Sequence, residues 1–253
     1  MPTLTLQCVS AVLTVLFAAV ALSISRHAIA PDRRAGWRLA GAGFLLLGAG
    51  MTAQYAGAVA AFASGPGTAA WDVYLRWAPA LNHSRIGGGI ALAAGVGYVA
   101  WTGRFPERRA WAGLAAGMEA ASLAAAWLGT PEGAFALRTH GSSLALGVTV
   151  ELVAFGAALL VSAARGTLDA FLFAALTLYA GSLALGVPVV SLMVLRTGVE
   201  DGRPPSWLLQ LVQVVSMSSM MALALLRLTL LRRGVRMRAV LGRHSAPHLH
   251  LRL

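Results

Sequence analysis

The sequence contains no lysine, so all twenty of its basic residues are arginines. Without a lysine amine the chain cannot hold retinal or pyridoxal phosphate as a Schiff base, and it cannot supply the lysine of a phosphate-binding P-loop. Cysteine is nearly absent as well, because Cys8 is the single one and lies in an apolar run. A disulfide framework and a metal cage built from cysteines alone are therefore excluded.

Charge is also scarce. Charged residues make up 11% of the chain and hydrophobic residues 58%, whereas soluble domains carry about 25% charged residues. Apolar runs of about 20 residues predict membrane-spanning helices. We expect an all-α integral membrane protein, with one bundle of seven transmembrane helices over 1–235 and a basic cytoplasmic tail over 236–253. The end of this tail, RHSAPHLHLRL, is expected to be unstructured. The predicted spans are 4–24, 37–62, 86–102, 110–129, 143–164, 168–195 and 206–231.

The arginines are distributed unevenly between the two sides of these spans. Fifteen are expected on one side: Arg26, Arg33, Arg34, Arg38, Arg104, Arg108, Arg109, Arg165, Arg227, Arg232, Arg233, Arg236, Arg238, Arg243 and Arg252. Five are expected on the other: Arg76, Arg85, Arg138, Arg196 and Arg203. The positive-inside rule then places the N-terminus outside and the C-terminus in the cytoplasm. We expect a bacterial cytoplasmic membrane, with anionic lipid headgroups as partners of the basic face and no role for nucleic acid.

Small residues are frequent within the spans, as in the GxxxG step of Gly113 and Gly117. In lipid, such residues let helices approach closely and pack by van der Waals contact, so they predict a tight bundle. Met217, Met220 and Met221 lie on one side of the last span, where thioethers either fill gaps in the packing or hold Cu(I).

The segment WDVYLRW precedes the third predicted span. Trp71, Tyr74 and Trp77 recur at i, i+3 and i+6, and Asp72 and Arg76 form an i, i+4 pair. This pattern predicts a short amphipathic helix in the headgroup region. Two interpretations stay open, an aromatic belt anchor and a lid over an outward-facing pocket.

Two histidines lie at the outer ends of the third and fifth predicted spans. His83 is followed by Arg85, and His140 is preceded by Arg138. These four residues either mark the water boundary or line an outward-facing pocket, whose cationic groups favour an anionic or polar ligand. Because neutral imidazoles on two helices can ligate one haem iron, His83 and His140 are also candidate haem or metal ligands.

Glu119 and Glu151 fall inside the fourth and fifth predicted spans. A lone charge at such depth is costly by roughly 2.5–3.5 kcal/mol or more, so both are predicted to face a polar interior. No arginine is expected at the same depth, and we therefore expect at least one of the two to be protonated at neutral pH. The pair is predicted either to bind a ligand or proton, or to form interhelical hydrogen bonds. The expected contacts are polar side chains of other spans: Gln54, Tyr55, Tyr179, Gln210 and Gln213.

Three functions agree with this pattern. The first is a non-catalytic sensor, receptor-like or ligand-binding module, which acts through a separate partner subunit or as a homo-oligomer. The second is a membrane subunit of a redox or energy-converting complex, with haem or quinone near His83 and His140 and a proton path through the two glutamates. The third is a small proton-coupled transporter. We favour the first function and expect no catalysis, because the GxSxG and HExxH motifs of hydrolases are missing.

Overall fold

A computed structural model describes the backbone of residues 2–27, 30–128, 137–195 and 206–244. Within these ranges, side chains are described except at 2–3, 32, 75–76, 78–83, 122–123, 125–128, 137–145, 187–195, 206–207 and 235–244. The described residues form seven α-helices and no strand: α1 (Pro2–His27), α2 (Pro31–Ser64), α3 (Ala69–Thr102), α4 (Arg108–Leu128), α5 (Leu137–Arg165), α6 (Ala170–Leu195) and α7 (Ser206–His244).

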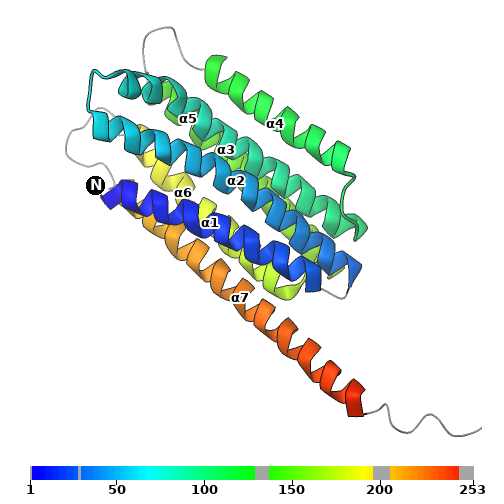
Figure 1. Cartoon of the computed structure of the whole chain (residues 1–253). Helices are drawn as coiled ribbons and strands as arrows, with labels where there is room; N and C mark the ends of the chain where they lie inside the picture. The colour runs from blue at the N-terminus through cyan, green and yellow to red at the C-terminus, as the bar shows by residue number, and fades with distance from the viewer. Residues whose placement is uncertain (1, 28–29, 129–136, 196–205, 245–253) are drawn as a thin grey trace, which may run out of the picture.

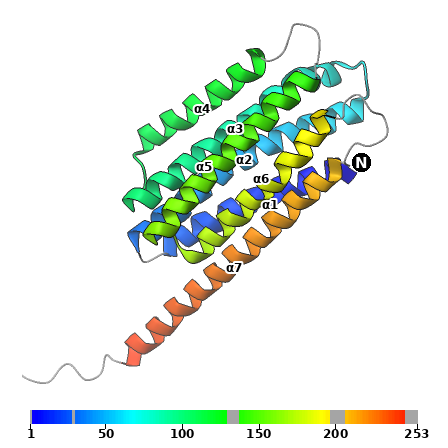
Figure 2. The ribbon, with the colours of Figure 1, turned by 180° about the vertical axis from the view of Figure 1, so that it is seen from behind.

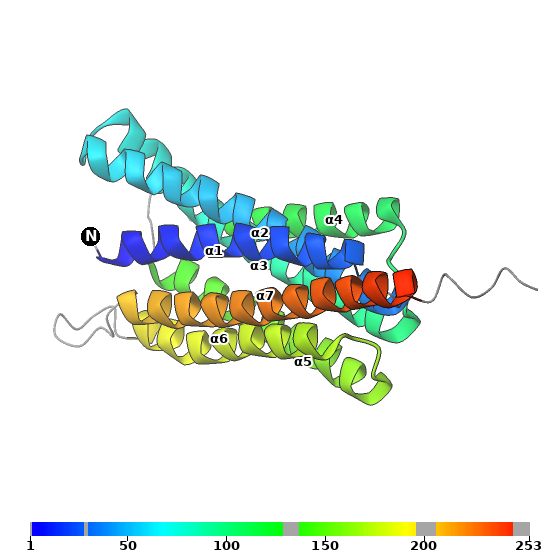
Figure 3. The same ribbon diagram turned by 60° about the horizontal axis from the view of Figure 1, so that its bottom comes forward.

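Six of the described helices close into a ring, and α4 lies outside it (Figures 1 and 2). Around the ring each helix packs on the next in the order α1, α2, α3, α5, α6 and α7. Figure 3 shows α7 beside α1, where the ring closes. The fourth helix packs mainly on α3 and touches α5 only slightly. The predicted single bundle of seven is thus a ring of six helices with α4 attached to its outer face.

The third helix begins at Ala69, well before the predicted start of its span at 86. Gly65 and Gly67 have φ values of +84° and +81° and turn the chain after α2. The Thr68 side chain then caps α3 by accepting a hydrogen bond from Trp71 N at 3.3 Å. The predicted separate interfacial helix is therefore the beginning of α3. The prediction is wrong because polar residues interrupt the apolar run here without interrupting the helix.

The last helix is also longer than predicted. It continues to His244, past the predicted end of its span at 231, and projects beyond the other helices (Figure 1). The sequence becomes basic along this projection, so charge replaces apolar residues while the backbone stays helical. Residues 236–244 of the predicted basic tail are therefore helical. Of the segment expected to be unstructured, 243–253, the first two residues belong to α7, and 245–253 lie outside the described residues.

Much of the described helical surface is apolar. Four described stretches are long and apolar enough to cross a membrane, with mean hydropathies between 1.4 and 2.3: Leu4–His27, Arg33–Ser64, Leu146–Arg165 and Leu208–Gly234. A shorter apolar stretch covers Ala170–Gly186. Large apolar side chains point outward, as at Leu160, which is 73% exposed, and Val153, which is 66% exposed. Such a surface suits contact with lipid, so the fold is that of a helical membrane-associated protein.

Glycine brings some helices of the ring very close together. A Cβ added at Gly41 would lie 2.6 Å from Leu22 Cγ, and one at Gly48 would lie 2.7 Å from Val15 Cγ2. The α1 and α2 backbones therefore meet through glycine, as small residues allow in membrane helices. In contrast, Gly113 and Gly117 of α4 have no described atom of another part of the chain within 4 Å of such a Cβ.

Arginine side chains join neighbouring helices at one end of the ring, which is the end where α6 begins. Arg227 of α7 pairs with Asp169 at 2.6 Å, and Asp169 also caps α6 by accepting a hydrogen bond from Phe171 N at 3.1 Å. Arg165 lies 3.7 Å from the centre of the Trp101 ring and donates to Trp101 O at 2.8 Å. We call this the arginine-rich end.

Candidate functional site

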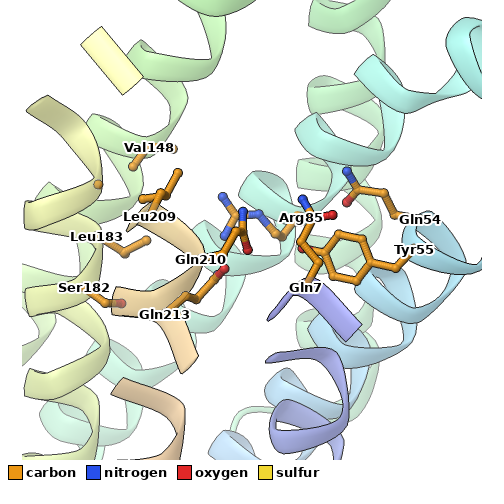
Figure 4. A pocket seen from close by; sticks show the side chains of 11 residues that line it. Gln7, Gln54, Tyr55, Arg85, Val148, Ser182, Leu183, Leu209, Gln210 and Gln213 are labelled. Carbon is orange, nitrogen blue, oxygen red and sulfur yellow. The ribbon is translucent and has the colours of Figure 1, made fainter. Parts of the chain in front are cut away.

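A cavity of about 150 Å³ lies within the ring, away from the arginine-rich end. Every helix of the ring contributes to its lining, and α4 contributes none of the described lining residues. We call it the Arg85 cavity, and Figure 4 shows its lining. The lining residues are Gln7, Gln54, Tyr55, Arg85, Val148, Ser182, Leu183, Gly186, Leu209, Gln210 and Gln213.

The lining combines one charge with several amides. Arg85 is the only charged residue among the described lining residues. In Figure 4 it lies between Gln210 and Gln213 on one side and Gln54 on the other. The Gln210 Oε1 atom is buried and has no hydrogen-bond partner among the described residues. Amides donate and accept hydrogen bonds, so together with the guanidinium they form a site for a small polar or anionic molecule.

Glu151 of α5 lies next to this cavity and is fully buried. Its Oε1 atom accepts a hydrogen bond from Tyr179 OH of α6 at 2.8 Å, which is one of the contacts expected from the sequence. Its Oε2 atom is buried without a hydrogen-bond partner among the described residues. A buried carboxylate oxygen without a partner is unfavourable for folding, which makes Glu151 a candidate functional group.

The Glu151 carboxylate occupies space that a side chain on α3 would otherwise fill. A Cβ added at Gly89 would overlap Oε1 and Cδ of Glu151. Glycine at this position therefore lets a carboxylate from α5 reach the surface of α3.

Arg85 interacts electrostatically with Glu151 and with Tyr179. No direct ion pair joins Arg85 to Glu151, since the ion pair found among the described residues is Arg227–Asp169. Attraction between charges in a protein interior nevertheless extends well beyond hydrogen-bond distance. Arg85 lines a cavity within the ring, as the pocket interpretation of this residue expects. Glu151 interacts with that arginine, although the sequence predicted no arginine near it.

Glu119 lies in a different environment. It projects from α4, is only partly buried, and accepts a hydrogen bond from the Ser84 side chain of α3. A Cβ added at Gly88 would lie 3.3 Å from Glu119 Oε1, whereas Gly89 meets Glu151. The two carboxylates thus reach different faces of α3. Glu119 attaches α4 to the ring and contributes nothing to the described lining of the Arg85 cavity.

A smaller space continues inward from the Arg85 cavity. Its volume of about 10 Å³ leaves room for roughly one water molecule. Arg85 and Gln213 line both spaces, and Tyr179 lines the inner one. The inner space therefore links the cavity to the hydroxyl that is hydrogen-bonded to Glu151.

An aromatic plug, consisting of Phe17, Phe44, Phe155 and Tyr179, lies nearer the arginine-rich end. Its rings meet edge to face, with centroids 4.9, 5.2 and 5.1 Å apart in successive contacts. The three phenylalanines are fully buried. On α1, α2, α5 and α6 alike, the plug residues lie closer to the arginine-rich end than the cavity residues do. The plug therefore separates the polar cavity from that end.

The aromatic residues predicted to cover the pocket lie elsewhere. Trp71 and Tyr74 pack on Phe62 of α2, with ring centroids 5.3 and 6.4 Å apart. Trp77 is 48% exposed, and none of the three lines the Arg85 cavity as described. The ring contacts of Trp71 and Tyr74 join the start of α3 to the end of α2. The aromatic belt anchor stays a prediction.

The remaining predicted candidates divide into two groups. The side chains of His83, Arg138 and His140 lie outside the described residues, so the haem and metal hypotheses stay predictions. Among the described side chains, no group of three or more His, Cys, Asp or Glu residues could hold a metal ion. Met217 and Met220 are 2% and 0% exposed in the core of the ring, as packing residues would be.

Sequence reasoning found some of the cavity and missed the rest. The sequence pattern indicated Arg85 as a pocket residue and Gln54, Tyr55, Gln210 and Gln213 as contacts of the glutamates, whereas Gln7 was overlooked. The signal was a lone amide in an apolar run, since Gln7 is as isolated among apolar residues in α1 as Gln213 is in α7.

Comparison of the chain with models of known protein families, with curated proteins and with solved structures gives no match. The function is therefore argued from the geometry of the site.

Proposed function

We propose that this chain is an integral membrane protein with seven transmembrane helices, which binds a small polar ligand in the Arg85 cavity without catalysis. It acts as a sensor or receptor-like module, and the cavity faces the outside of a bacterial cytoplasmic membrane. The observation that carries the proposal is a cavity inside a ring of apolar helices, with one cation and several amides in its described lining.

Helix length supports seven spans. At a rise of 1.5 Å per residue, the 21 residues of α4, the shortest helix described, extend about 31 Å. This matches a hydrocarbon core of about 30 Å, and the other six helices are longer. The outward orientation of the N-terminus is supported by the arginines, which concentrate at the other end of the ring.

The aromatic plug favours ligand binding over transport. It closes the ring between the cavity and the arginine-rich end, and its three phenylalanines are fully buried. Among the described side chains, these rings lie between the cavity and the arginine-rich end, so a ligand would have to displace them to cross the ring. A bound ligand would instead contact residues of all six helices of the ring. One of these helices is α7, whose basic extension gives a structural route for a signal.

Filling the cavity tests the proposal. Gly186 of α6 lines the cavity, whereas Gly181 of the same helix faces open space. We expect Gly186→Leu to abolish the thermal stabilisation that small polar molecules give to the purified protein, because the added side chain occupies their site. Gly181→Leu is the matched control and should keep that stabilisation. The proposal fails if both variants respond to the same compounds as the wild type does.

A small proton-coupled transporter is the second candidate, because the buried Glu151 lies beside a cavity with a cation. Flux of a bound ligand into liposomes, lost in Glu151→Gln, would favour transport over ligand binding alone. The redox alternative depends on His83 and His140, and a visible absorption spectrum of the purified protein tests it directly.

A further inference from the structure

We infer that the Arg85 cavity takes a small monovalent carboxylate and binds it together with one proton, which Glu151 accepts. The inference rests on the proposed ligand-binding function and names its ligand class. The proton comes from the buffered solution, where the protonated buffer supplies it, and it converts the Glu151 carboxylate into a neutral carboxylic acid.

Charge balance is the first argument. In the ligand-free protein at a pH where Glu151 is ionised, the charges of Arg85 and Glu151 neutralise each other across the interior of the ring. A carboxylate ligand that enters the cavity binds the same guanidinium. The site then holds two negative charges, those of the ligand and of Glu151, and the single positive charge of Arg85. A net charge in an interior of low dielectric is unfavourable, and uptake of one proton by Glu151 restores neutrality.

The geometry of Arg85 is the second argument. The guanidinium has five N–H donors in a planar fork that matches a carboxylate in two-point contact. Arg85 lines the cavity and makes no direct ion pair with Glu151 within the described part of the chain, so Glu151 does not occupy that fork. Arg85 can therefore bind an entering carboxylate while Glu151 stays in place behind it.

Glu151 is suited to accept a proton. Its Oε2 atom is buried without a described partner, whereas Tyr179 already donates to Oε1. A proton on Oε2 would remove the charge and leave the bond from Tyr179 intact. The inner space beside Tyr179 has room for about one water molecule. A water there would provide a route for the proton from the cavity.

The cavity favours a monovalent ligand over a divalent one. Its lining as described holds a single cation, and one proton on Glu151 compensates a single negative charge. A dianion such as phosphate would leave a second charge uncompensated. The amides of Gln210 and Gln213 can bind the rest of a small molecule, which has to fit in about 150 Å³.

The titratable groups around Glu151 limit what else could cause a pH dependence. Arg85 faces it from α3 and Tyr179 from α6, and Tyr55 of α2 acts on Arg85. From α4, Glu119 reaches another face of α3, beside Ser84. The α7 residues that line the cavity are uncharged. The experiment also needs a control for the histidines at positions 83 and 140, because histidine is the side chain that ordinarily changes charge between pH 5 and 8.

The test uses propionate as the probe and propionamide as its neutral isostere, with the full-length protein in detergent. Binding is measured by calorimetry between about pH 6 and 8.5, where propionate is ionised. We expect the Kd for propionate to rise about tenfold per pH unit across the upper part of this range. Measurements in two buffers of different ionisation enthalpy should show about one proton taken up per propionate bound.

Three variants assign the proton. Glu151→Gln imitates the protonated acid, so it should bind propionate with the affinity of the wild type at low pH and with no pH dependence. Glu119→Gln is the matched control, because its carboxylate lies outside the cavity, and it should keep the wild-type slope. The double variant His83→Gln/His140→Gln should keep it as well. The two-buffer measurement needs no variant, so it decides the question even where Glu151→Gln does not fold.

Each alternative result has a distinct meaning. A pH-independent Kd in the wild type, or a slope that persists in Glu151→Gln, overturns the inference and leaves ligand binding intact. The same holds where propionamide binds as tightly as propionate, or where only neutral compounds stabilise the protein in a Gly186-dependent manner. If no compound binds in the cavity, the proposed function fails together with the inference.

Discussion

At the residue scale, the absence of a side chain at Gly89 determines where the buried carboxylate of Glu151 lies. Gly89 leaves room on α3 for the Glu151 carboxylate, which in turn interacts with Tyr179 and Arg85. The neighbouring Gly88 does the same for Glu119 on another face of the helix. The glycine run of α3 is therefore a pair of contact sites for carboxylates, in addition to a surface for close packing.

Gly89→Ala should displace the Glu151 carboxylate and break its hydrogen bond to Tyr179. We expect this overpacking to destabilise the fold by about 1–3 kcal/mol. Gly97→Ala, on the same helix, is the matched control, because its added Cβ would lie 3.7 Å from Ala158 Cβ, an ordinary contact. That variant should be neutral or slightly stabilising, since alanine favours helix. Thermal unfolding in detergent measures both, and equal midpoints for the two variants would contradict the close contact at Gly89.

At the scale of single helices, the apolar runs predict where helices lie but not where they end. The predicted spans agree with α1, α2 and α4 to α6 because apolar sequence and helix coincide there. They fall short for α3 and α7, whose helices continue through polar residues. Hydropathy predicts whether a side chain suits lipid or water, whereas a helix continues for as long as its backbone hydrogen bonds continue. The interaction of Arg85 with Glu151 could not be predicted from the sequence, because the two residues lie on helices that are far apart along the chain.

The start of α6 offers a test at this scale, because Asp169 both caps the helix and pairs with Arg227. Asp169→Asn keeps a capping side chain and loses the ion pair. We expect a loss of about 2–3 kcal/mol, between the values for surface and buried pairs, because the Arg227 side chain is 20% exposed. Asp169→Ala should lose about 1 kcal/mol more with the cap.

Thermal unfolding of these two variants gives the order of stability directly. Arg232→Gln serves as a control, because Arg232 is exposed on the same helix as Arg227 and should leave the midpoint unchanged. An Asp169→Asn variant as stable as the wild type would show that the pair contributes nothing.

At the scale of the whole molecule, the ring divides into a polar part around Arg85 and an apolar part around the aromatic plug. The division is the same on neighbouring helices of the ring. Their polar lining residues lie at the same end of the ring, whichever way the chain runs along each helix. The fold class could be predicted from composition, because scarce charge and long apolar runs leave few alternatives. The position of α4 outside the ring could not be, because its apolar run resembles the others and helix order in space depends on side-chain fit.

Orientation in the membrane can be measured with single cysteines in a Cys8→Ser background. Pro66→Cys lies in the exposed turn between α2 and α3, and Glu107→Cys lies in the exposed connection between α3 and α4. With the N-terminus outside, a membrane-impermeant maleimide should label Pro66→Cys in intact cells and leave Glu107→Cys unlabelled until the cells are opened. The reverse pattern would place the cavity on the cytoplasmic side.

The pairing of Arg85 with Glu151 also has a consequence for biosynthesis. Arg85 precedes Glu151 by 66 residues, so at 5–20 residues per second it is synthesised roughly 3–13 s before its counter-charge. During that interval α3 carries an arginine without its counter-charge, which costs roughly 2.5–3.5 kcal/mol or more within a spanning helix. On the proposed topology, we expect the nascent helix to stay beside the insertion machinery, or near the membrane surface, until α5 supplies the carboxylate of Glu151. The ring is then completed late in biosynthesis, at a time set by the rate of translation.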